Sequence, residues 1–243
     1  MQRYFADSKI TTEYQLTPEI YKHAIKVLRM KVGDAFELVD DAEVVHKMEI
    51  TKIEDGKAEA TSVEVIPSDV ELPLNVTIAC GISKNDKADW IVQKGTEMGA
   101  TKFIFFVGDY SVAKWDKKRS SKKVQRLQKI ARSAAEQSHR TKIPEVTFVE
   151  KLKDIDFEKN DARIVAYEES AKKGESGNLF KILNKKPSDI IAIFGPEGGI
   201  SPKEIEFLEA NSFILAGLGP RIMRAETAPL YFLASLSFAL ELS

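Results

Sequence analysis

The segment Ile190–Ala210, IIAIFGPEGGISPKEIEFLEA, decides the fold class of this chain. It opens with five apolar residues, Ile190–Phe194, an unbroken run typical of a strand that is buried on both faces of a sheet. A glycine-rich turn follows, and Pro202–Ala210 has the composition of a helix. A strand, a turn and a helix in this order predict one βα unit of a parallel sheet.

The same alternation extends from Leu74 to the end of the chain. Further strands are expected at 76–80, 103–107, 163–167 and 213–216, and further helices at 86–98, 117–138, 178–183 and 227–242. This pattern predicts an α/β domain with a mainly parallel sheet and helices on both faces. General chain-connection rules favour an unknotted, Rossmann-like arrangement of that sheet.

Residues 1–70 have a different pattern and predict a separate small unit. Thr17 and Pro18 can begin a helix that runs to Met30. Short strands at 35–39, 44–53 and 57–66, joined by turn residues, suggest a small β-barrel. A linker rich in proline follows, so two domains are expected, at 1–70 and 72–243.

Composition excludes several classes of protein. The chain has 243 residues, 43% of them apolar and 30% charged, as expected of a globular protein. One cysteine and three scattered histidines exclude a disulfide framework and indicate no metal site. The N-terminus has no signal-peptide pattern, and the most apolar stretch, Ala228–Leu240, is shorter than the ~20 residues of a membrane span. A cytoplasmic location is expected, with no membrane partner.

Charge is distributed unevenly along the chain. The formal net charge is −1, yet residues 114–142 hold 11 basic and two acidic residues. Within the helix expected there, Lys122, Arg126 and Lys129 share one face. A field of this strength suits a polyanion such as RNA. The alternative is a lysine-rich helix face that is only solvated.

The last expected helix has no polar face, because leucine, phenylalanine and tyrosine occur all around it. A helix of this kind must be covered on every side. Two interpretations stay open. It is either a central core helix or a helix shared between the sheet and a second subunit.

Two glycine-rich segments, 194–202 and 215–228, each join a strand to a helix. Open α/β sheets bind ligands at this edge, so the two segments should form one pocket. Their charged groups are Glu197, Arg221, Arg224 and Glu226. Neither segment matches the dinucleotide or Walker phosphate pattern, and no nucleophile–base set is present. This inventory suits the positioning of a reactive cofactor better than hydrolysis.

Five segments together resemble the ribosomal RNA small-subunit methyltransferase E family of the SPOUT superfamily. They are HAIKVLRMKVGD (His23–Asp34), GISKNDKADWIVQKGTEMGA (Gly81–Ala100), IARSAAEQSHR (Ile130–Arg140), FGPEGGISPKE (Phe194–Glu204) and LGPRIMRAETA (Leu218–Ala228). They occur in the family's order over nearly the whole chain. Two departures stand out: Tyr110 where the family more often has arginine, and His139 where glycine is common.

The resemblance implies a knotted SPOUT domain over 72–243, preceded by a PUA-like or OB-like barrel, in a homodimer acting on 16S rRNA of the small ribosomal subunit. The implied cofactor is S-adenosyl-L-methionine. The residues expected to bind it are Gly195, Pro196, Glu197, Gly198, Gly199, Leu215, Gly217, Leu218, Gly219, Ile222, Met223, Thr227 and Ala228. The expected RNA contacts are Arg29, Lys122, Arg126, Lys129 and Arg140.

The implied reaction is methylation of uracil N3. Methyl transfer from a sulfonium is a displacement, so the protein mainly aligns the two reactants. Arg221 or Arg224 could stabilise the uracil anion, and Glu226 is the candidate proton acceptor among the catalytic residues. Three alternatives stay open: a ribose 2′-O-methyltransferase of rRNA or tRNA, a non-catalytic RNA-binding assembly factor, and an enzyme that binds a nucleotide on the FGPEGG segment.

Overall fold

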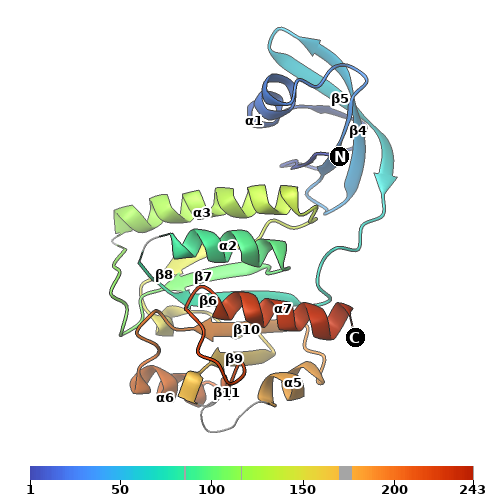
Figure 1. Ribbon diagram of the computed structural model, residues 1–243. Helices are drawn as coiled ribbons and strands as arrows, with labels where there is room; N and C mark the ends of the chain where they lie inside the picture. Colours follow the sequence, from blue (N-terminus) through green and yellow to red (C-terminus); the bar gives the residue numbers. More distant parts are fainter. Residues whose placement is uncertain (85, 116, 170–176, 243) are drawn as a thin grey trace. The chain divides into compact units, whose positions relative to one another are not determined.

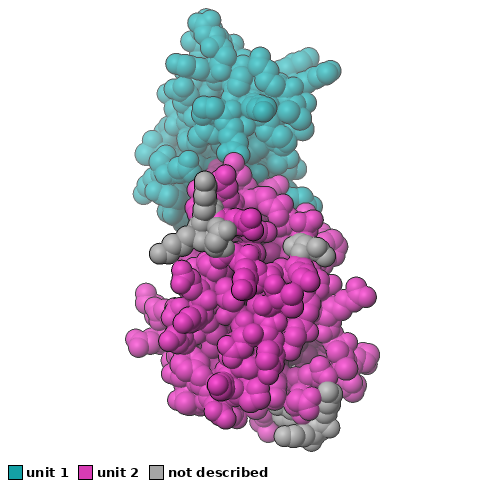
Figure 2. Space-filling model, turned by 90° about the vertical axis from the view of Figure 1, so that its left-hand side faces the viewer, with its two compact units in different colours: residues 1–71, 135–142 teal, residues 72–134, 143–243 magenta. Residues whose placement is uncertain are grey.

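A computed structural model describes residues 1–84, 86–115, 117–169 and 177–242. The chain forms two compact units, coloured separately in Figure 2. Unit 1 contains Met1–Glu71 together with Ala135–Lys142, and unit 2 contains Leu72–Ala134 and Ile143–Ser243. The short segment 135–142 therefore groups with the N-terminal residues, which a division by sequence order alone does not give.

Unit 1 is built on a five-stranded sheet around an apolar cluster. The strands, in spatial order, are β1 (Arg3–Phe5), β3 (Ala35–Val39), β4 (Val45–Glu54), β5 (Lys57–Ile66) and β2 (Glu13–Gln15). All neighbours are antiparallel except β1 and β3. Phe36, Leu38, Met48 and Ile50 are fully buried between the strands and the first helix. The sequence predicted β3, β4 and β5 and missed the two three-residue strands.

The helix of unit 1 is shorter than predicted and changes type. Thr17 caps α1 (Pro18–Tyr21), since its hydroxyl accepts from the N–H of Ile20 at 3.3 Å. The chain then widens into the π-helix η1 (Lys22–Val27). Arg29 follows with a left-handed φ of +58°, so the helix ends before the predicted Met30. π-helical turns of this kind are rare and are frequent at functional sites.

The segment 135–142 is tied into unit 1 by ion pairs. Arg140 is only 2% exposed, and its Nε lies 3.1 Å from Glu71 Oε2. Burial opposes ionisation of Glu71, but hydrogen bonds from Arg140 and from the Thr141 and Lys142 amides prevail and lower its pKa. His139 has a φ of +56°, a conformation that glycine adopts without strain, and its Nδ1 lies 3.1 Å from Glu37 Oε2.

Unit 2 contains a six-stranded sheet in which every neighbouring pair is parallel, which confirms the predicted, mainly parallel sheet. The strands, in spatial order, are β11 (Ile214–Ala216), β9 (Ala162–Ala166), β10 (Asp189–Phe194), β6 (Asn75–Gly81), β7 (Lys102–Phe106) and β8 (Glu145–Val149). The edge strand β8 was not predicted. The connection between β8 and β9 includes the 3₁₀ turn η2 (Leu152–Asp154).

Helices cover both faces of this sheet (Figure 1). They are α2 (Lys87–Glu97), α3 (Lys117–Gln137), α5 (Asn178–Leu183), α6 (Pro202–Ala210) and α7 (Ala228–Glu241). Along β10, Ile190, Ala192 and Phe194 join the cluster with α2, α3 and α7, whereas Ile191 and Ile193 join the cluster with α6. The prediction that Ile190–Phe194 is buried on both faces is confirmed.

Helix α7 is buried on one face only. Phe232, Leu233 and Leu236 are completely buried, and the helix packs on α2. On the other face Tyr231 and Phe238 are 40% and 66% exposed. The interpretation of α7 as a central core helix is therefore wrong for this chain. Across the described residues, the structure contains no helix long and apolar enough to cross a membrane.

Candidate functional site

A pocket of about 980 Å³ lies at the carboxyl edge of the unit 2 sheet, where the two glycine-rich segments meet. We call them the β10 loop (Gly195–Ser201) and the α7 loop (Gly217–Thr227). Most of the residues predicted for the cofactor and for catalysis line this pocket: Gly195, Pro196, Glu197, Gly198, Gly199, Leu218, Gly219, Arg221, Ile222, Met223, Arg224, Glu226 and Ala228. Leu215, Gly217 and Thr227 are not among its lining residues.

The β10 loop is held by close backbone packing. A Cβ added to Gly195 would lie 2.8 Å from the carbonyl carbon of Gly199, and one added to Gly198 would lie 2.7 Å from Tyr110 Cβ. Pro196 is buried, and its Cδ would lie 2.5 Å from a Cβ at Gly81. Glycine at positions 81, 195 and 198 therefore allows the β10 loop to approach both the end of β6 and the segment around Tyr110 closely.

The end of the β10 loop is anchored by a hydrogen-bonded helix cap. Ser201 Oγ accepts from the Glu204 amide at 3.2 Å, and Glu204 Oε2 accepts from the Ser201 amide at 2.9 Å. Ser201 Oγ also donates to Asp109 Oδ2 at 2.6 Å, while the Asp109 amide donates to Glu204 Oε1 at 3.1 Å. These reciprocal bonds fix the loop to the segment that follows β7.

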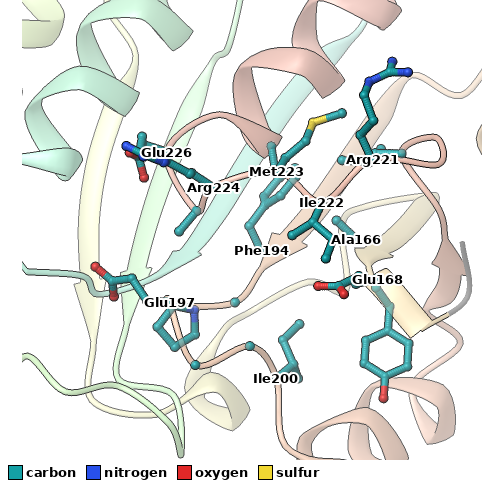
Figure 3. A pocket seen from close by; sticks show the side chains of 18 of the residues that line it. Ala166, Glu168, Phe194, Glu197, Ile200, Arg221, Ile222, Met223, Arg224 and Glu226 are labelled. Atoms are coloured by element: carbon teal, nitrogen blue, oxygen red, sulfur yellow. The ribbon is translucent and has the colours of Figure 1, made fainter. Parts of the chain in front are cut away.

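The α7 loop is more open. Arg221 and Arg224 are exposed, and Ile222 is 73% exposed. In Figure 3, Arg224 and Glu226 lie on the same side of the pocket as Glu197, whereas Arg221 lies beyond Met223 and points away. The loop turns into α7 where the amides of Thr227 and Ala228 donate to the Arg224 carbonyl at 2.9 and 3.1 Å.

Lys87, the first residue of α2, joins the two loops. Its Nζ lies 3.0 Å from Glu197 Oε1 and 3.2 Å from Glu226 Oε2. The hydrogen bond to Glu197, reinforced by Glu226, raises the pKa of the Lys87 ammonium against the effect of burial. Burial opposes ionisation of Glu197, but the Lys87 hydrogen bond prevails and lowers its pKa.

Sequence reasoning missed Lys87 and the pocket residues that follow β9, Tyr167, Glu168 and Glu169. The sequence contained a pattern that indicates both sets of residues. The strands expected at 76–80 and 163–167 end at the same edge of a parallel sheet as β10, so the residues just after them belong to the ligand-binding edge.

The pocket fits S-adenosylmethionine chemically. Phe194, Ile200, Leu218 and Met223 offer apolar surface for an adenine ring, and the backbone of both loops offers amides and carbonyls. The pocket lining holds four carboxylates and three basic side chains, an excess of negative charge that suits a sulfonium cation: Glu168, Glu169, Glu197 and Glu226 against Lys87, Arg221 and Arg224. No cluster of histidine, cysteine, aspartate or glutamate suited to a metal ion occurs within the described ranges.

The predicted RNA contacts separate into two groups. Arg29, Lys122 and Lys129 are exposed, and the part of the chain that the structure describes gives Lys122 and Lys129 no ion pair. Arg126 Nη2 lies 2.6 Å from Asp89 Oδ1, so α2 supplies an acidic partner that the sequence did not reveal. Arg140 is buried against Glu71 and is therefore unavailable to a phosphate. Arg140 therefore lies where RNA cannot reach its side chain, contrary to the prediction.

Comparison with known proteins adds independent findings. Residues 70–237 match a family described as an RNA methyltransferase domain, and residues 16–61 match an RNA methyltransferase PUA domain. Ribosomal RNA small subunit methyltransferase E of Bacillus subtilis is 40% identical over 100% of this chain and 98% of its own.

Two solved structures bear on the pocket. Ribosomal RNA small subunit methyltransferase E of Neisseria gonorrhoeae, bound to S-adenosyl methionine, is 27% identical, with a TM-score of 0.85 over 98% of both chains. A putative methyltransferase from Legionella pneumophila, also in complex with that cofactor, is 25% identical, with a TM-score of 0.80 over 98% of this chain and 97% of its own.

Proposed function

Because this chain belongs to the ribosomal RNA small subunit methyltransferase E family, we propose that it transfers the methyl group of S-adenosylmethionine to N3 of one uridine in 16S rRNA. The observation that carries the proposal is the pocket formed by the two glycine-rich loops, with Glu197, Arg224 and Glu226 on one side of it. The proposal assigns the β10 loop to the cofactor and Arg224 and Glu226 to the reacting base.

When bound, the cofactor supplies an activated methyl group on a positively charged sulfur. The residues of the pocket must hold that methyl group in line with uracil N3, and they must accept the N3 proton. Gly195 and Gly198 pack closely against Gly199 and Tyr110, so this part of the β10 loop can orient the cofactor. Arg224 can stabilise negative charge on the uracil oxygens, as donors in an oxyanion hole do.

The target base must leave the base-paired stack to expose N3. Two basic surfaces support RNA binding. One is the face of α3 that carries Lys122, Arg126 and Lys129. The other is the segment 20–33 of unit 1, where Lys22, Lys26, Arg29 and Lys31 occur without an acidic residue. Residues 1–69 hold 9 basic and 14 acidic residues in total, so this exposed segment is a local exception. Phosphate neutralisation at such sites is strongly salt-dependent.

A homodimer is also proposed. Tyr231, Phe238 and Ile222 are exposed apolar side chains on α7 and on the loop before it, and Trp90 of α2 is 51% exposed. Apolar surface gathered on neighbouring elements is typical of an interface. Phe238→Glu should convert a dimer into a monomer in sedimentation equilibrium. A monomeric wild-type protein that is fully active would contradict the proposal.

We also propose the trefoil knot that the family implies for unit 2. A cytoplasmic location is a further proposal, because the proposed substrate is ribosomal RNA.

The decisive experiment incubates the purified protein with S-adenosylmethionine and small ribosomal subunits that lack the modification, followed by mass mapping of 16S rRNA fragments. The expected result is one methyl group, on the base of a single uridine. A methyl group on a ribose would support a 2′-O-methyltransferase instead. RNA binding without cofactor binding would support an assembly factor.

A further inference from the structure

Lys87 lines the pocket but has no role in the function proposed above. The ammonium group of Lys87 lies within 3.2 Å of carboxylates from both glycine-rich loops. Its side chain is 24% exposed, so the three charges meet in a partly buried place where electrostatic interactions are stronger than in water. We call Lys87, Glu197 and Glu226 the Lys87 cluster.

The two carboxylates of the Lys87 cluster are not equivalent. Glu197 Oε1 also accepts from the Lys84 amide at 3.3 Å, and the pKa of Glu197 is lowered. Glu226 Oε2 is buried and accepts no hydrogen bond from the described residues, although the ammonium lies near it. Glu226 therefore has a carboxylate oxygen that accepts no hydrogen bond within the part of the chain that the structure describes, whereas the lowered pKa of Glu197 favours its ionised form.

The charge of the Lys87 cluster suits a proton acceptor. One cation and two anions leave one negative charge in excess. If Glu226 takes up a proton, Lys87 keeps Glu197 as its partner and the cluster becomes neutral. If Glu226 were its only partner, protonation of Glu226 would leave Lys87 as an unpaired charge in a partly buried site, which is energetically unfavourable.

We propose that Lys87 is a positioning residue for proton transfer, holding Glu226 at the pocket wall while Glu197 remains as its permanent counter-charge. This inference rests on the proposed function. In the step itself, the N3–methyl bond forms as the methyl–sulfur bond breaks, and the bonding pair returns to sulfur as a neutral thioether. The N3 proton moves to the carboxylate of Glu226.

The first test needs neither cofactor nor RNA. The protein alone is labelled with ¹³C at glutamate carboxyl carbons and titrated by NMR, with the Glu197 signal identified from Glu197→Gln. Lys87→Met should raise the apparent pKa of Glu197, because the ammonium whose hydrogen bond lowers that pKa is removed. Lys87→Arg should restore it. Lys94→Met, on the same helix and paired with Glu97 at 2.8 Å, is the matched control.

A second variant predicts the opposite shift. Glu226→Gln removes a like charge and leaves Lys87 with Glu197 as its only partner, so the apparent pKa of Glu197 should fall further. Opposite shifts in the two variants require the coupling proposed here. An unchanged Glu197 titration in both would overturn the proposal.

The second test measures methylation of small subunits. Lys87→Met should lower kcat at least ~30-fold, a loss within the range of a general base. It should change KM for RNA and the affinity for S-adenosylmethionine by less than ~3-fold, and Lys87→Arg should recover most of the rate. Loss of cofactor affinity with normal kcat would overturn a role in proton transfer. Absence of uracil methylation by the wild-type protein, beside the predicted NMR shifts, would refute the proposed function and leave the charge coupling standing.

Discussion

The two glycine-rich loops of the pocket are built in opposite ways. The β10 loop packs closely against its neighbours at Gly195, Gly198 and Pro196, and it ends in a reciprocal cap between Ser201 and Glu204. The α7 loop leaves Arg221, Ile222 and Arg224 exposed. Lys87 is the charged connection between them.

This difference between the loops matches two separate tasks of a methyltransferase, which are aligning the cofactor and admitting the RNA. A cofactor that is already activated has to be aligned, and alignment requires a preformed, rigid wall. The substrate is a large RNA that must be admitted, and an open loop with arginines can close on it. We therefore expect changes at the closely packed glycines of the β10 loop to abolish cofactor binding, and changes at the arginines of the α7 loop to reduce turnover.

The largest effect is expected from Gly198→Val. Its side chain would overlap Tyr110, whose Cβ lies 2.7 Å from the position of a new Cβ. Overpacking of this kind costs ~1–3 kcal/mol or more and should displace the loop, so S-adenosylmethionine binding should be lost with or without RNA. Calorimetry and thermal melting check this.

Gly219→Ala is the matched change in the α7 loop. Gly219 has a φ of +94°, but a Cβ there would meet only Tyr231 Oη, at 3.9 Å. Conformational strain of ~1–2 kcal/mol is expected, with cofactor binding retained. Equal loss of binding in both variants would break the contrast between the loops.

The next largest effect concerns the arginines. Arg224→Ala should lower turnover by ~100-fold with cofactor affinity nearly unchanged, the scale of a lost oxyanion contact. Arg221→Ala should have a smaller effect, because Arg221 points away from the pocket (Figure 3). Calorimetry measures the cofactor affinity of both variants, and the methylation assay measures their turnover. Parallel loss of affinity and turnover in both variants would assign the arginines to the scaffold.

Binding to RNA should depend on exposed charge rather than on total basic content. Replacing Lys122 and Lys129 together with alanine should reduce the slope of log affinity against log salt by about two, if each contacts one phosphate. Filter binding over a salt series measures it. Arg140→Ala should instead lower the free energy of unfolding, because it removes the buried cation that pairs with Glu71.

The smallest effect is expected from Ser201→Ala, which removes the helix cap and the bond to Asp109. Loss of such a cap costs ~1 kcal/mol, measurable by denaturant unfolding. Cofactor affinity should fall only a few-fold, since the glycine contacts remain. A complete loss of binding would show that the cap, and not the packing, orders the loop.

The sequence was sufficient for the parts of the fold that depend on local pattern. The run Ile190–Phe194 and the glycines after it predicted β10, its loop and the position of the pocket. The strands β1, β2 and β8 were missed, because three to five residues at a sheet edge carry too little periodicity to be recognised. The π-helical turn at Lys22–Val27 leaves no recognisable pattern either.

Charge patterns along the sequence were less reliable, because they do not show partners from distant segments. Arg140 and Arg126 belong to the same basic segment, yet one is buried against Glu71 and the other pairs with Asp89. Lys87 was overlooked for the same reason, since its two partners are more than a hundred residues away in the sequence.

The central claim is that the pocket between the two loops binds the cofactor, with one wall preformed and the other ordered by binding. Hydrogen exchange of the protein alone, with and without saturating S-adenosylmethionine, tests it most directly. The β10 loop should already be protected and change little, whereas amides of residues 217–227 should become strongly protected. Protection that arises elsewhere, or an α7 loop that exchanges equally fast in both states, would contradict the claim.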